Sequence, residues 1–116
     1  MQVLRITGLP DDPLEAAAVF HAGWLPRIQA LMSERRPDGD LLLAFASANH
    51  THRDWRLAAV RGLAREGKPL RINAVAGDDE RAVESAARYL ADAPGVTGQY
   101  LPLDGAGAGP VVGLVG

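Results

Sequence analysis

Side chains able to do chemistry gather between residues 47 and 54 of this 116-residue chain. Two imidazoles and a carboxylate lie close enough in sequence to hold a metal ion, with His50, His52 and Asp54 as ligands. A serine, a histidine and an aspartate could instead act together in hydrolysis. A third interpretation is a solvated loop in which Thr51 or Asp54 caps a following helix. We predict a candidate ligand-binding loop without a resident metal, formed by Ser47, Asn49, His50, His52 and Asp54.

The loop follows a continuous apolar run over residues 41–46. A run of this length is typical of a parallel strand that is covered on both faces. Open α/β sheets bind ligands beyond the carboxyl ends of their strands. The loop therefore lies where such a sheet would place a site for a small polar ligand.

The first third of the chain predicts one strand and one long helix. Residues 2–7 alternate apolar and polar side chains, which indicates a strand. Asp12 is a candidate N-cap, and Pro13 follows it at the first helical position. The helix is expected to reach about residue 34. Pro26 lies inside it and predicts a kink or an unpaired carbonyl.

The remaining chain repeats the alternation of strand and helix. A helix is expected over residues 54–66 after the polar loop, and Gly67 is a suitable terminator. Residues 70–75 predict a buried strand whose Asn73 bonds the backbone. A further helix, with Asp78 as its candidate N-cap, precedes a last short strand over residues 99–103.

The order β-α-β-α-β-α-β predicts an α/β fold with a mostly parallel four-stranded sheet in sequential order. Residues 1–105 are expected to form a single domain, and residues 106–116 a glycine-rich tail. Right-handed crossovers in one direction would place every helix on one face of the sheet.

Composition narrows the classes of function. The chain has no cysteine, which excludes disulfides, thiolate metal sites and cysteine nucleophiles. The net charge of −2 gives no basic footprint for nucleic acid. No apolar run is long enough to span a membrane, and the N-terminus lacks the pattern of a signal peptide. We expect a cytoplasmic protein with neither a nucleic-acid nor a membrane partner.

Three segments of the second half carry a family resemblance. Residues 71–76 read Arg-Ile-Asn-Ala-Val-Ala, residues 89–92 read Tyr-Leu-Ala-Asp, and residues 97–105 read Thr-Gly-Gln-Tyr-Leu-Pro-Leu-Asp-Gly. In this order and spacing they resemble the C-terminal half of the short-chain dehydrogenase/reductase family, although Gly77 stands where that family usually has Pro-Gly. The resemblance implies a Rossmann-like half domain whose last helix crosses to the other face of the sheet.

The family's catalytic residues are not carried over by this resemblance. Its Tyr-x-x-x-Lys pair, in which lysine lowers the tyrosine pKa for acid/base work, falls on Arg53 and Leu57. Ser47 matches the catalytic serine, but the first 48 residues contain no asparagine. No glycine-rich turn follows a first strand, so the dinucleotide fingerprint is absent. The resemblance therefore implies a non-catalytic protein that does not bind NAD or NADP as the family does.

Assembly is implied more strongly than chemistry. In the family, the corresponding two helices pair across a two-fold axis, and half a sheet would leave the edge of its first strand open. We expect a homodimer or a dimer of dimers, with a full-length reductase as an alternative partner. The helix over residues 13–34 carries a second apolar stripe, and the helix over residues 54–66 has a low-profile surface. The interface is expected near Phe20, Trp24, Leu31, Ala58 and Gly62.

Overall fold

The chain forms one parallel four-stranded sheet in the order β1-β2-β3-β4. The computed structural model describes residues 1–34 and 39–103. The strands are β1 (Gln2–Ile6), β2 (Leu41–Phe45), β3 (Ile72–Ala76) and β4 (Tyr100–Pro102). The predicted sequential parallel sheet is confirmed. The expected tail over residues 106–116 lies outside the described residues.

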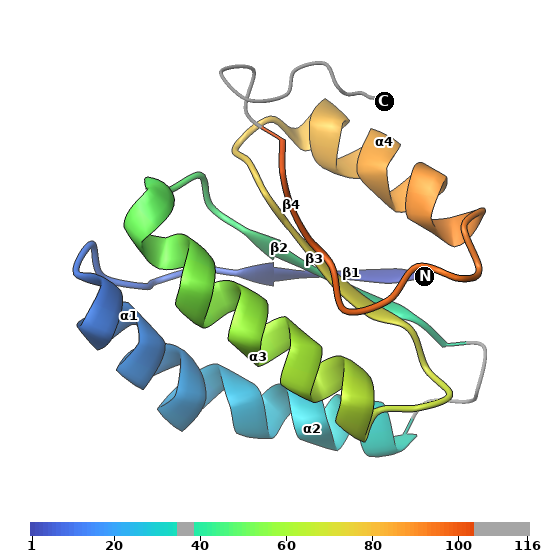
Figure 1. Ribbon diagram of the computed structural model, residues 1–116, viewed down its shortest axis with the longest axis horizontal. Coiled ribbons are helices and arrows are strands. Elements are labelled where there is room, and N and C mark those ends of the chain that lie inside the picture. Colours follow the sequence, from blue (N-terminus) through green and yellow to red (C-terminus); the bar gives the residue numbers. More distant parts are fainter. Residues whose placement is uncertain (35–38, 104–116) are drawn as a thin grey trace.

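Helices cover both faces of this sheet (Figure 1). On one face lie α1 (Pro13–Val19), the π-helical turn η1 (Phe20–Trp24), α2 (Leu25–Glu34) and α3 (Arg53–Glu66). The opposite face carries α4 (Glu80–Ala91). Side chains of β2 alternate accordingly: Leu41, Leu43 and Phe45 enter the first core, and Leu42 and Ala44 enter the core beneath α4.

The last crossover differs from the first two. Each strand steps in the same direction across the sheet, so a helix on the opposite face gives its connection the opposite hand. The expectation of right-handed crossovers throughout is therefore wrong for the connection through α4. The crossing implied by the family resemblance is confirmed.

The long first helix is interrupted by a π-helical turn. Asp12 caps α1 as predicted, because its carboxylate accepts a hydrogen bond from Glu15 N at 3.0 Å. At the end of η1, Leu25 N donates to Phe20 O, five residues back. Pro26 follows immediately, and its ring would clash with the carbonyl four residues earlier in a regular α-helix. The wider turn accommodates the proline where the sequence predicted a kink.

Phe20 lies at the centre of the first core. It is 0% exposed, and its ring centroid lies 5.7 Å from that of Phe45 and 5.5 Å from that of Trp55. The side chain therefore belongs to the protomer's own core and offers no surface to a second subunit. This corrects its expected place at an interface.

Capping at the other two helices shifts by a few residues from the prediction. A 3-10 turn, η2 (His50–His52), leads into α3, and Asn49 caps it by accepting from Thr51 N at 2.9 Å. Thr51 and Asp54 are therefore not the caps. Asp79, rather than Asp78, caps α4 by accepting from Arg81 N at 3.0 Å.

Gly67 ends α3 because the space is too small for a side chain. Its φ of −87° is not left-handed, so the usual reason for a glycine terminator does not apply. A Cβ there would lie 2.9 Å from both Ile72 Cδ1 and Met32 Cε. The glycine lets α3 turn closely against β3 and α2.

Two polar side chains tie the sheet to its connections. Asn73 on β3 is fully buried; its amide donates to Val96 O and accepts from Gln99 N, both at 3.0 Å. Its predicted backbone-bonding role is confirmed. Arg71 pairs with Asp40 at 2.7 Å and donates to Leu90 O, near the end of α4, at 3.0 Å. No helix among the described residues is long and apolar enough to cross a membrane.

Candidate functional site

A pocket of about 250 Å³ opens at the carboxyl ends of β1 and β2, on the α3 side of the sheet. A second pocket, of about 190 Å³, adjoins it towards α4 and shares Ile6, Thr7 and Ala46. The first pocket is lined by Ile6, Thr7, Gly8, Leu9, Pro10, Asp11, Ala46, Ser47, Ala48, His52 and Arg56. Its position agrees with the place where open α/β sheets bind ligands.

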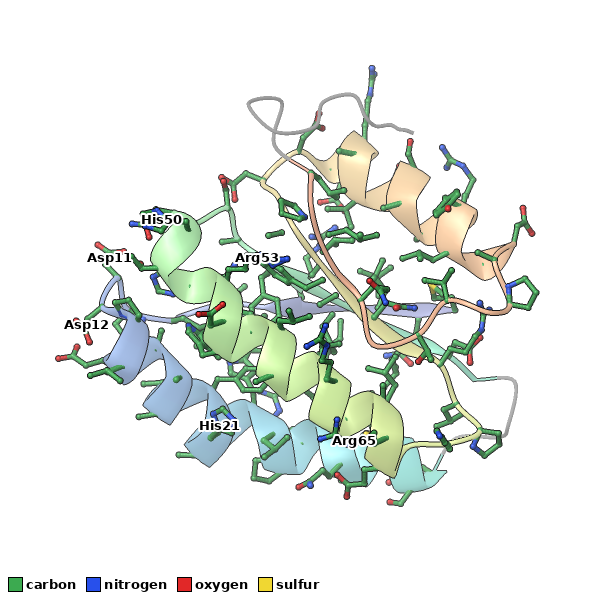
Figure 2. The ribbon with its side chains drawn as sticks, in the orientation of Figure 1. Asp11, Asp12, His21, His50, Arg53 and Arg65 are labelled. Atoms are coloured by element: carbon green, nitrogen blue, oxygen red, sulfur yellow. The ribbon has the colours of Figure 1, made fainter. Side chains whose placement is uncertain are left out.

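The predicted loop is divided by the fold rather than gathered. Ser47 and His52 line the pocket, whereas Asn49, His50 and Asp54 do not. Figure 2 shows His50 at the outer end of the molecule, where α1 and α3 both begin. Asn49 is used as a helix cap, and Asp54 is exposed in the first turn of α3. Only two of the five candidate side chains therefore face one space.

His52 has a structural role that uses both ring nitrogens. The residue is 4% exposed, and Nδ1 accepts a hydrogen bond from Trp55 Nε1 at 3.2 Å. Nε2 lies 2.8 Å from Asp11 O, so it must carry the proton and donate. The ring thus links the start of α3 to the loop before α1. It keeps no free lone pair for a metal ion or for a general base.

The metal interpretation of the loop is not supported. Within residues 1–34 and 39–103, no group of three or more histidine, aspartate or glutamate side chains is placed to hold a metal ion. Ser47 bonds elsewhere through its backbone, with its N–H donating to Asp78 Oδ1 at 3.0 Å. That contact ties the end of β2 to the loop after β3.

Arg56 is the pocket residue that sequence reasoning missed. It is 4% exposed, and Nη1 donates to Ala46 O at 2.9 Å and to the Tyr100 hydroxyl at 3.1 Å. Its guanidinium carbon lies 4.5 Å from the centroid of the Phe45 ring. A signal existed, because Arg56 occupies the core-facing stripe of α3 with Val60, Leu63 and Ala64.

The positions that match the family's catalytic pair lie apart from any suitable chemistry. Arg53 is exposed at the first turn of α3, and Leu57 is half-buried. Tyr89 is 65% exposed on α4, across the sheet, and the Tyr100 hydroxyl is bonded to Arg56. The chain's single lysine, Lys68, follows the far end of α3.

The residues expected near an interface divide into two kinds. Trp24 is half-buried; its Nε1 donates to Thr7 O at 3.2 Å, and the Arg27 guanidinium lies 4.5 Å from its ring. Leu31 is half-buried and packs against the first core. Ala58 is exposed, and a Cβ at Gly62 would meet no atom within 4 Å. Ala58 and Gly62 therefore present an open, low surface on α3.

The comparisons with known proteins agree with this architecture. Searches of curated proteins and of solved structures gave no match. The family model described as "short chain dehydrogenase-like protein" (SDR-like) matches residues 4–103, which include every strand and helix given above. The four-stranded parallel sheet with its last helix on the opposite face fits this match. The chain belongs to the SDR-like family of short chain dehydrogenase-like proteins.

Proposed function

We propose that this chain is a non-catalytic member of the SDR-like family that acts as an oligomerisation or interaction module. The observation that carries the proposal is the open surface of α3, where Ala58 is exposed and Gly62 has space around it. Glycine in a helix interior costs about 1 kcal/mol relative to alanine. Nothing within the described residues packs at Gly62, so close approach by a second chain accounts for it.

The lack of catalysis is supported by the positions that match the family's acid/base pair. Arg53 cannot be a tyrosine's equivalent in proton transfer, and Leu57 cannot lower a neighbour's pKa. Lys68 and both tyrosines lie in other elements. Hydrolysis through Ser47 and His52 is disfavoured, because Nδ1 of His52 accepts from Trp55.

The partner that this surface fits best is a second copy of the same chain. Leu14, 84% exposed on α1, and Val19, 42% exposed at its end, add apolar side chains on the neighbouring helix. Figure 1 places α1 and α2 beside α3 on one face of the sheet. An isologous contact between these helices is expected to bury at least about 1,200 Å² in total.

The test is the mass of the intact chain in solution. Light scattering at micromolar concentration is expected to give a dimer or a tetramer, and Ala58→Glu is expected to give a monomer that unfolds at nearly the same temperature. Ala91→Glu, on the exposed side of α4, is the matched control and should keep the wild-type mass. A monomeric wild type would refute the proposal, as would an Ala58→Glu variant that keeps the assembly.

A full-length reductase is the alternative partner. In that case the isolated chain is monomeric, and a reductase from the same cell co-purifies with it through the α3 surface. The Ala58→Glu substitution should then remove the reductase, whereas Ala91→Glu should not.

A second candidate function is the binding of a small molecule in the pocket beside β1 and β2. The observation in its favour is that Ser47 and His52, both predicted ligand-loop residues, line one space of about 250 Å³. This function does not exclude assembly, because the pocket lies at the ends of the strands and Ala58 and Gly62 do not line it.

A further inference from the structure

We propose that the pocket beside β1 and β2 binds a small organic carboxylate through the guanidinium of Arg56. The inference rests on the second function proposed above, and it names the chemistry of the ligand. It follows from one buried cation, from the groups that surround it and from the shape of the space that it lines.

Arg56 is a buried cation without an anion. Its neighbours satisfy only part of its hydrogen-bonding capacity, since both of its hydrogen bonds come from Nη1. Across the described residues, the ion pairs are Arg5 with Glu80 and Arg71 with Asp40, and neither includes Arg56. Buried charges in folded proteins are normally paired, because removal from water disfavours an isolated ion. The missing partner is therefore a negative charge.

The free edge of the guanidinium has the geometry that a carboxylate matches. Nε is buried without a hydrogen-bond partner, and it is the one side-chain atom of this kind in the part of the chain that the structure describes. Nε and Nη2 form one side of the planar fork, which binds the two oxygens of a carboxylate with parallel hydrogen bonds. A carboxylate on this edge would satisfy Nε and supply the counter-charge together.

The pocket adds an apolar compartment next to this charge. Ile6, Leu9, Pro10, Ala46 and Ala48 contribute aliphatic surface to the lining. A volume of about 250 Å³ equals that of about eight water molecules in the liquid. The space thus suits a short hydrocarbon chain or ring that carries one acidic group.

The surrounding charges favour a monoanion. Arg56 is the single cationic lining residue besides His52, whose ring is neutral by its hydrogen bonds. The lining residue Asp11 is an exposed carboxylate, which would repel a doubly charged phosphate more than a carboxylate. The N-terminal end of α3 lies beside the pocket and adds a partial positive charge.

The experiment is a titration of the intact 15N-labelled chain, followed by the NMR signals of the Thr7 and Ser47 amides and of Arg56 Nε–H. The probes are hexanoate, its neutral counterpart 1-hexanol and inorganic phosphate, all at constant ionic strength. Hexanoate is expected to shift these signals saturably, with a dissociation constant of about 1 mM or tighter. Hexanol and phosphate should bind at least about tenfold more weakly, a tenfold difference being about 1.4 kcal/mol.

Variants assign the effect to Arg56. Arg56→Met should weaken hexanoate binding at least about tenfold, and the matched Arg65→Met variant, exposed on the same helix (Figure 2), should bind as the wild type does. If Arg56→Met does not fold, the Nε–H signal of the wild type decides, since the inference requires it to move with hexanoate.

Each other outcome overturns the inference. Equal binding of hexanol and hexanoate would leave an apolar small-molecule pocket, so the second proposed function would survive without the carboxylate. Tighter binding of phosphate would assign the site to a different anion. No binding of any probe, or an unmoved Nε–H signal, would remove both the inference and that second function, while the assembly proposal would stand on its own measurement.

Discussion

Arg71 and Arg56 are both largely buried, and we expect their replacement by methionine to have very different effects on stability. In Arg71→Met, Asp40 loses its ion pair, although it still accepts a hydrogen bond from Arg71 N at 2.8 Å. The Asp40 side chain is 12% exposed, so its charge stays largely buried. Leaving one partner of a buried pair alone costs about 3 kcal/mol at the lower end of the usual range.

In Arg56→Met the losses and gains nearly cancel. The variant loses two charged hydrogen bonds and a cation–π contact over Phe45, together on the order of 5 kcal/mol. It also removes an unpaired buried charge and the unbonded Nε, an effect of similar size. The methionine can pack against the ring of Phe45. We expect the free energy of unfolding to change by less than about 1.5 kcal/mol, the small residue of these two sums.

Urea unfolding followed by far-UV circular dichroism measures both variants. Protein concentration is held constant because assembly would add to the apparent stability. Arg65→Met, which removes an exposed arginine of α3, is the control and should change the free energy of unfolding by less than about 0.5 kcal/mol. If Arg56→Met were as destabilising as Arg71→Met, Arg56 would be an ordinary structural residue, and the reasoning from its missing anion would be wrong.

Three further predictions use the same chain. Gly67→Ala should lower the free energy of unfolding by about 1–3 kcal/mol in urea, because its Cβ would overlap Ile72 and Met32. Asn73→Leu should lower it by about 3 kcal/mol, since Val96 O and Gln99 N lose their partner; a near-neutral result would show that water replaces the amide. Isothermal titration with NAD or NADP should give no dissociation constant tighter than about 100 μM, and tighter binding would contradict the reading of the missing fingerprint.

The sheet could be read from the sequence because its signals are local. The apolar run over residues 41–46 and the cap at Asp12 depend on few neighbours, and both appear in the structure as β2 and the start of α1. The face on which α4 packs is not local. It depends on which side of β3 is already covered, and only the family resemblance, not the handedness rule, predicted it correctly.

The site was harder to predict because a polar residue can face either solvent or the interior. His52 and Arg56 are both polar residues at the start of α3, yet both are buried. For His52 the sequence does not reveal that Asp11 and Trp55 will bond its two nitrogens. For Arg56 the helical spacing to Val60 did place it on the core side, but a charge on that stripe was overlooked.

The two edges of the sheet differ in how open they are to another strand. Gln2 N donates to Asp40 O, so in this parallel register Gln2, Leu4 and Ile6 bond β2 while Val3 and Arg5 direct their N–H groups outward. On β4, Leu103 N donates to Ala76 O, which leaves Tyr100 and Pro102 facing outward. Pro102 has no N–H to offer, and β4 is only three residues long. β1 is therefore the edge on which sheet extension would occur.

Amide hydrogen exchange separates assembly through the helices from assembly through this edge. If two copies meet at Ala58 and Gly62, the amides of Val3 and Arg5 stay open to water and should exchange much faster than those of Leu4 and Ile6, which donate to β2. The comparison is internal to one strand, so differences in global stability cancel. Slow exchange at all four amides in an assembled sample, lost on dilution to the monomer, would show that β1 is paired between copies. The α3 surface would then not be the interface, and Ala58→Glu would leave the mass unchanged.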